Sequence, residues 1–179
     1  MKSYFYKNLF LQRLSVSLFM LLVSTVVFAN EYSGKTKLKT TSMKPLACPC
    51  SLFTPADAPT LAETNRYDGQ PLEVGLKFQA NVDGVIQAIR FYKGNLDPDN
   101  AHIGNLWTTT GANLGTITFT GETPSGWQEM AFSSPIAVSA GVTYVASIFN
   151  PSGYYSATNF FFNTAYSVSP LTGIGTGDP

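Results

Sequence analysis

Apolar side chains occupy every second position of residues 72–80, and polar residues or glycine lie between them. This period of two predicts a β-strand with one buried face. Residues 81–84 follow with the chemistry of a turn, and residues 85–93 are predicted as the next strand. The two strands are expected to form a hairpin.

Further short strands are predicted at regular spacing, with glycine and proline marking the turns between them. No helical period persists for three turns. Strands of this kind without amphipathic helices predict an all-β fold, an antiparallel β-sandwich with either a jelly-roll or an immunoglobulin-like topology. The remaining predicted strands are residues 103–109, 114–120, 127–132, 142–149 and 154–162.

The N-terminal region has a different pattern. Basic residues in the first dozen or so positions precede an uncharged apolar run from Leu14 to Ala29. This layout predicts a signal peptide over residues 1–29, cleaved after Ala29. A retained membrane anchor is the alternative, but the run is shorter than a helix that crosses a bilayer requires. Residues 30–47, where lysines alternate with small polar residues, are predicted as a flexible polar tether, and residues 48–179 as the folded domain.

Charge excludes one class of partner. The chain has 11 basic and 11 acidic residues, and loss of the predicted signal peptide removes only basic ones. Because no basic face remains, nucleic acid is not expected to bind. The sequence instead predicts a secreted or cell-surface protein that contacts a membrane only through its signal peptide during export.

Cys48 and Cys50 flank a proline, and three interpretations stay open. An oxidising environment favours a local disulfide, although residues two apart are at the outer limit of its geometry. Reduced structural thiols are the second interpretation. A metal site or a lipid anchor is the third, but other metal ligands and an apolar run directly upstream are missing.

Candidate chemistry is otherwise sparse. Asp97, Asp99 and Asn100 form an oxygen-rich loop, a weak candidate for Ca²⁺ that also fits an ordinary solvated turn. His102 is the single histidine, and no nucleophile, paired carboxylates or phosphate-binding loop accompanies it. We therefore expect no enzyme activity and no cofactor.

Several aromatic residues could present flat faces to sugar rings. Tyr154 and Tyr155 follow a Pro-Ser-Gly turn, which favours the surface, and Tyr92 is a further candidate. Trp107 and Trp127 fit either ligand contact or core packing. Tyr92, Trp107, Tyr154 and Tyr155 are accordingly candidate ligand contacts, although core packing is the more frequent use of such side chains.

Six stretches, in order along the chain, together resemble the DUF4082 family from about Cys48 to the end. The resemblance implies an extracellular accessory role, because the family is a domain of unknown function in large secreted bacterial proteins, often beside immunoglobulin-like repeats and polysaccharide-active modules. His102 and Trp107 match a recurrent histidine and tryptophan of the family in position, and the resemblance implies no role for them. His102 is a further candidate ligand contact. The stretches are CPCSLF (48–53), LEVGLKF (72–78), IRFYK (89–93), HIGNLW (102–107), SGWQ (125–128) and TYVAS (143–147).

This chain departs from the family pattern at its C-terminal end. The resemblance implies that relatives continue with a closing strand where this chain ends in a glycine-rich tail. A last strand is therefore predicted to be missing. Taken together, the sequence predicts a non-catalytic extracellular module that binds a polysaccharide or cell-surface glycan, or acts in adhesion. The alternative is a structural spacer or assembly domain of a larger surface protein.

Overall fold

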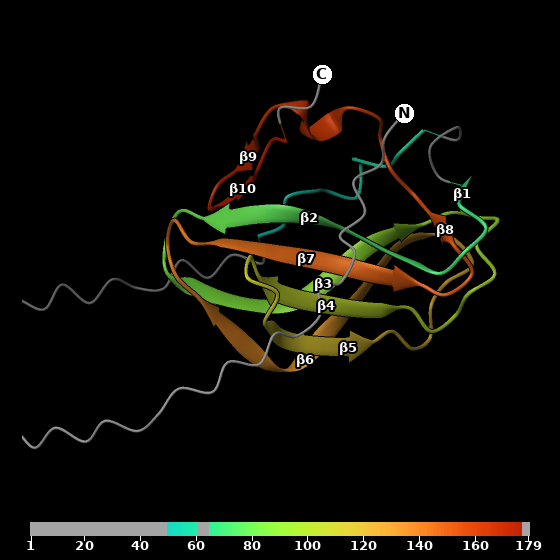
Figure 1. Cartoon of the computed structure of the whole chain (residues 1–179), viewed down its shortest axis with the longest axis horizontal. Coiled ribbons are helices and arrows are strands. Elements are labelled where there is room, and N and C mark those ends of the chain that lie inside the picture. The colour runs from blue at the N-terminus through green and yellow to red at the C-terminus, as the bar shows by residue number, and fades with distance from the viewer. Residues whose placement is uncertain (1–49, 61–64, 177–179) are drawn as a thin grey trace, which may run out of the picture. The chain divides into compact units, whose positions relative to one another are not determined.

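The computed structural model describes residues 50–60 and 65–176 of the chain (Figure 1). The predicted signal peptide, the tether and Cys48 lie outside these residues. Within the described part, no helix is long and apolar enough to cross a membrane.

The described residues form β-strands and one short 3-10 helix, η1 (Phe161–Asn163), so the predicted all-β class is confirmed. The strands are β1 (Arg66–Tyr67), β2 (Leu72–Ala80), β3 (Gly84–Lys93), β4 (Ile103–Thr108), β5 (Asn113–Thr118), β6 (Gly126–Val138), β7 (Thr143–Asn150), β8 (Tyr154–Tyr155), β9 (Tyr166–Val168) and β10 (Leu171–Gly173).

Two sheets make the sandwich. One has the order β5-β4-β7-β2-β10-β9, and the other pairs β3 with β6, both antiparallel. Figure 1 shows β2, β7, β4 and β5 side by side, with β3 and β6 crossing behind them. The pairs β2–β7, β3–β6 and β4–β5 are nested one within the next, which is the arrangement of a jelly roll and decides between the two predicted topologies.

The period-two pattern places apolar residues between the sheets, as predicted. On β2, Phe78 and Ala80 are buried while Glu73 and Lys77 face outward. The predicted hairpin is wrong in its pairing, however, because β2 and β3 belong to different sheets. The buried core consists of Leu52, Phe78, Ala80, Ile89, Leu106, Ile117, Phe119, Phe132, Val138, Tyr144 and Ile148.

The C-terminal segment differs from the prediction of one strand over residues 154–162. β8 ends at Tyr155, and Phe161 and Phe162 pack around Phe53, with ring centroids 5.5 and 6.2 Å away. Packing of aromatic side chains thus outweighs their intrinsic strand preference. The β9–β10 hairpin then pairs with β2, so both edges of β2 are paired. The closing strand predicted to be missing would follow Pro179, so its absence stays a prediction.

Gly75 allows β2 and β7 to approach closely. It lies opposite Ser147, and an added Cβ would meet the Ala146 carbonyl oxygen and lie 2.8 Å from the Ser147 Cβ. We expect Gly75→Ala to lower the free energy of unfolding by about 1 to 3 kcal/mol, because backbone must move. Urea denaturation of the full chain measures this change. Gly84→Ala is the matched control, since no atom lies within 4 Å of the added Cβ, and equal losses in the two variants would contradict the explanation.

Candidate functional site

Five charged or titratable residues gather at one end of β3 and β4. Lys93 ends β3, His102 directly precedes β4, and Glu122 lies between β5 and β6. Asp97 and Asp99 belong to the loop between β3 and β4. We call Lys93, Asp97, Asp99, His102 and Glu122 the buried polar cluster.

Glu122 is the centre of this cluster, and its side chain is 1% exposed. One carboxylate oxygen, Oε2, lies 2.9 Å from Nδ1 of His102 and 3.0 Å from Nζ of Lys93. The other oxygen, Oε1, accepts the backbone N–H of His102 at 2.9 Å. A buried carboxylate is tolerable only with such partners, because burial otherwise strips it of water.

Lys93 has further partners around its ammonium group. It donates to the backbone carbonyl of Asp99 and, at 3.2 Å, to Oδ1 of Asn100. These bonds fasten the loop between β3 and β4 to the end of β3.

The imidazole of His102 lies between two carboxylates and is completely buried. Its Nε2 is 3.1 Å from Oδ2 of Asp97, close enough for an ion pair when the ring is protonated, although the two atoms are poorly aligned for a hydrogen bond. Burial alone would lower the pKa of His102, whereas Asp97 and Glu122 on either side of the ring together raise it above its ordinary value. The ring of Phe91 covers the imidazole, with centroids 4.7 Å apart.

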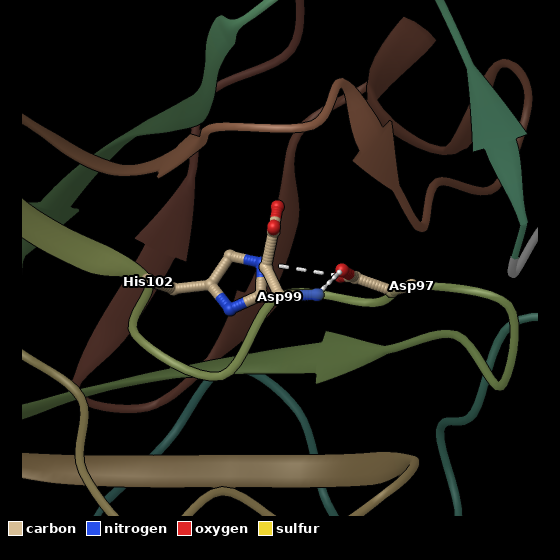
Figure 2. A group of neighbouring side chains, drawn as sticks. All are labelled: Asp97, Asp99 and His102. Carbon is tan, nitrogen blue, oxygen red and sulfur yellow. Dashed lines mark hydrogen bonds and ion pairs between the residues drawn. The ribbon is translucent and has the colours of Figure 1, made fainter.

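Asp99 connects the cluster to the turn between β7 and β8. Its carboxylate accepts the N–H of Ser152 at 2.9 Å and the hydroxyl of Ser152 at 2.7 Å. Its own N–H donates to Oδ1 of Asp97 at 3.0 Å (Figure 2). The predicted calcium set of Asp97, Asp99 and Asn100 is not assembled, because Asn100 Oδ1 faces the Lys93 ammonium, and His102 takes the third place beside the two aspartates.

A second group of polar side chains covers the outer face of the larger sheet, and we call it the outer-face network. Gly75, Ser147, Asn105 and Thr116 lie directly opposite one another on four adjacent strands. Side chains from the neighbouring rows extend over this row of small residues. The network consists of Glu73 on β2, Ser147 on β7, Asn105 and Trp107 on β4, and Asn113 and Thr116 on β5.

Hydrogen bonds connect the network across the sheet. The indole N–H of Trp107 donates to Oγ of Ser147 at 2.8 Å, and that hydroxyl donates to Oε1 of Glu73 at 2.6 Å. The amide of Asn105 donates to the same Glu73 oxygen at 2.9 Å, and its Oδ1 accepts from Thr116 Oγ1 at 2.7 Å. Asn105 and Ser147 are buried beneath this layer, while Trp107 is partly exposed.

The structure distributes the predicted ligand contacts over different places. Trp107 belongs to the outer-face network, and Tyr154 packs against Tyr67, with ring centroids 4.6 Å apart. Tyr92 and Tyr155 line a cavity of about 50 Å³ that Asp97 also borders. Burial, followed by the charge of Asp68, raises the pKa of Tyr155.

His102 differs from the other candidate ligand contacts in its burial. Because it is 0% exposed, its side chain cannot contact a ligand at the protein surface. Trp127, for which either role was open, packs against Tyr92 and lies beneath the guanidinium of Arg90, 4.6 Å from the ring centroid.

Sequence reasoning missed Lys93 and Glu122 of the buried polar cluster, and every member of the outer-face network except Trp107. The sequence gives only a weak indication of Lys93 and Glu122, because they are charged residues at or beside predicted strands in a chain that has few charged residues. Asn105, Thr116 and Ser147 occupy outward positions of predicted strands, but only the pairing of the strands shows that they are neighbours.

Cys50 takes part in a disulfide. Its predicted partner, Cys48, lies outside the described residues, so the pairing of these two residues stays a prediction.

The family model described as "Domain of unknown function (DUF4082)" matches residues 56–178. The chain belongs to the DUF4082 family. This match confirms the resemblance seen in the sequence, and it includes every residue of the buried polar cluster and of the outer-face network. No curated protein matches this DUF4082 chain.

The buried polar cluster should contribute strongly to the stability of the DUF4082 domain. Glu122→Gln leaves the buried ammonium of Lys93 without its counter-charge, so we expect the free energy of unfolding to fall by about 3 to 5 kcal/mol. Urea denaturation followed by circular dichroism measures the loss. Glu129→Gln is the matched control, because Glu129 is 63% exposed and its ion pair with Arg90 spans 3.7 Å. It should change stability by less than about 1 kcal/mol, and a similar small effect for Glu122→Gln would contradict the central role of that carboxylate.

Proposed function

We propose that this DUF4082 domain is a non-catalytic extracellular module that binds carbohydrate, as polysaccharide or cell-surface glycan, through the outer-face network. The observation that carries the proposal is Trp107, a partly exposed indole held by hydrogen bonds beside a carboxylate and amides. Fold alone would not indicate this function, since the same sandwich serves many functions.

The chemistry of the network matches that of a sugar. A sugar ring has apolar C–H faces that pack on aromatic rings, and hydroxyls that both donate and accept hydrogen bonds. Trp107 offers the aromatic face. Glu73 offers an acceptor, because none of the described residues donates to its second oxygen, Oε2. Asn113 and Thr116 add exposed amide and hydroxyl groups at the edge of the sheet.

The network also holds its groups in place before any ligand arrives. Trp107 is fixed through Ser147, which is itself bonded to Glu73. Because these side chains lose little conformational freedom on binding, less of the interaction energy is lost to ordering them.

The burial of the charged groups supports a role without catalysis. His102, the single histidine, has no exposed surface. The cavity of about 50 Å³ bordered by Asp97 has room for water but not for a sugar ring.

The alternative, a structural spacer or assembly domain, is favoured by two exposed aromatic residues away from the network. Phe160 is 72% exposed and Tyr67 is 59% exposed. Phe160 also has a positive φ of 59°, which is uncommon for a bulky residue. A neighbouring protein that covered these rings would explain their exposure.

Single-tryptophan variants of the full chain test the carbohydrate proposal. Trp127→Phe leaves Trp107 as the only tryptophan, so its fluorescence reports on the outer-face network alone. We expect a saturable change in emission from this variant with a polysaccharide that the full chain retains in affinity electrophoresis. Trp107→Phe should weaken that retention by about tenfold, equivalent to about 1.4 kcal/mol.

Each variant serves as the control for the other, because both keep an aromatic ring. Equal retention of Trp107→Phe and the unaltered chain would exclude Trp107 as the contact. If a diverse set of polysaccharides gives neither retention nor a fluorescence change, the carbohydrate proposal is wrong and the spacer role is favoured.

A further inference from the structure

Three potential metal-ligand side chains converge in the buried polar cluster. Asp97, Asp99 and His102 each offer one ligand atom, and these atoms lie within 4.8 Å of one another. Figure 2 shows the His102 ring and the Asp97 carboxylate facing one another, with Asp99 between them in this view. We propose that Asp97, Asp99 and His102 bind a divalent transition-metal ion, with Zn²⁺ as the best-matched ion.

The strongest support comes from the unsatisfied ring nitrogen of His102. Nδ1 faces the carboxylate of Glu122 at 2.9 Å and donates its proton there, because an ionised carboxylate can only accept. In the neutral imidazole Nε2 then carries a lone pair, and this buried nitrogen makes no hydrogen bond although it lies within ion-pair distance of Asp97. Oδ2 of Asp97, which also carries lone pairs, lies 3.1 Å away. Two such atoms repel unless a proton or a metal ion lies between them, and a bound metal ion would replace the proton that the flanking carboxylates otherwise favour on the ring.

The surroundings of His102 resemble those of a metal ligand. Histidines that bind metals usually donate their other ring N–H to a carboxylate, which sets the tautomer and the ring orientation. Glu122 meets this requirement, and its own position is fixed by Lys93 and by the backbone N–H of His102.

The two aspartates are held in suitable positions as well. Oδ1 of Asp97 accepts the N–H of Asp99, which leaves Oδ2 directed at His102. Asp99 is held by Ser152, and each of its oxygens retains a lone pair for a cation. Charges also match: the Lys93 ammonium neutralises Glu122, and the two aspartates neutralise a divalent ion.

The mixture of ligands selects the type of ion. One imidazole nitrogen with two carboxylate oxygens suits Zn²⁺ or Mn²⁺, whereas Ca²⁺ takes six to eight oxygen ligands. A water in the cavity of about 50 Å³ beside Asp97 can complete the coordination. Asp99 is only half-buried and provides a path from solvent.

Such an ion would serve a structural purpose. It would join the loop between β3 and β4 to the start of β4 through Asp97 and His102. Through Asp99 and Ser152 it would reach the turn between β7 and β8.

Because the chain has one histidine, its ring nitrogens can be observed directly. We would label the untagged full chain with ¹⁵N-histidine and record a long-range ¹H–¹⁵N spectrum before and after addition of Zn²⁺. We expect the Nε2 resonance to shift to the range of a metal-bound nitrogen while Nδ1 stays protonated. An unchanged spectrum in excess Zn²⁺, or an Nε2 that carries a proton there, would overturn the proposal. Zn²⁺ bound only by cysteine thiols would likewise leave Nε2 unchanged.

Affinity for Zn²⁺, measured by calorimetry, tests the aspartates. Asp99→Asn keeps the shape of a half-buried side chain and should weaken binding by at least about tenfold. Asp83→Asn is the matched control, because Asp83 lies at the opposite end of β3 from Lys93 and should bind Zn²⁺ like the unaltered chain. Equal affinities for all three proteins would also overturn the proposal. If Asp99→Asn does not fold, as judged by circular dichroism, the histidine spectrum of the unaltered chain decides alone.

Discussion

The buried carboxylate of Glu122 is the interaction on which this end of the sandwich depends. Its partners are Lys93 at the end of β3 and His102 at the start of β4, while Glu122 itself lies between β5 and β6. One charged group thus joins segments from both sheets. Removal of Glu122 would leave the buried ammonium of Lys93 without its counter-charge, which is why this carboxylate matters more than either of its partners.

Strand β4 connects this buried cluster to the outer face. Its inward residues, Gly104 and Leu106, pack in the core, and an added Cβ at Gly104 would lie 3.1 Å from Phe119. Its outward residues, Asn105 and Trp107, belong to the outer-face network. Since alternate residues of one strand serve the two faces, the position of Trp107 depends on how the core and the cluster hold β4.

The sequence predicted the features that depend on local pattern. Alternation over residues 72–80 identified β2 and its buried face, because a period of two needs no knowledge of the partner strand. Pairing was not predictable in the same way. The turn at residues 81–84 indicated a hairpin, yet the chain crosses from one sheet to the other there, and β2 pairs with the distant β7. The strand β10 was missed because its three residues gain their stability from β2 rather than from their own pattern.

The candidate sites were harder to predict for a related reason. His102 and Trp107 were singled out from the sequence by their residue types, but their burial and partners come from tertiary contacts. Glu122 lies 20 residues after His102 and 29 after Lys93, and no spacing rule connects such positions. Asn105 and Ser147 are ordinary polar residues in sequence. They become part of a network only because β4 and β7 are adjacent in register.

The two groups differ in what they can offer to other molecules. The buried polar cluster has charges but almost no surface, so only a small ion or water can reach it. The outer-face network has surface and hydrogen-bonding groups but only one carboxylate, Glu73. Glycoside hydrolysis canonically uses a pair of carboxylic side chains, whereas recognition requires only fixed donors, acceptors and an aromatic face. The separation of charge from surface in this fold therefore leaves the outer-face network, rather than the buried polar cluster, as the surface to which the proposed carbohydrate binding applies.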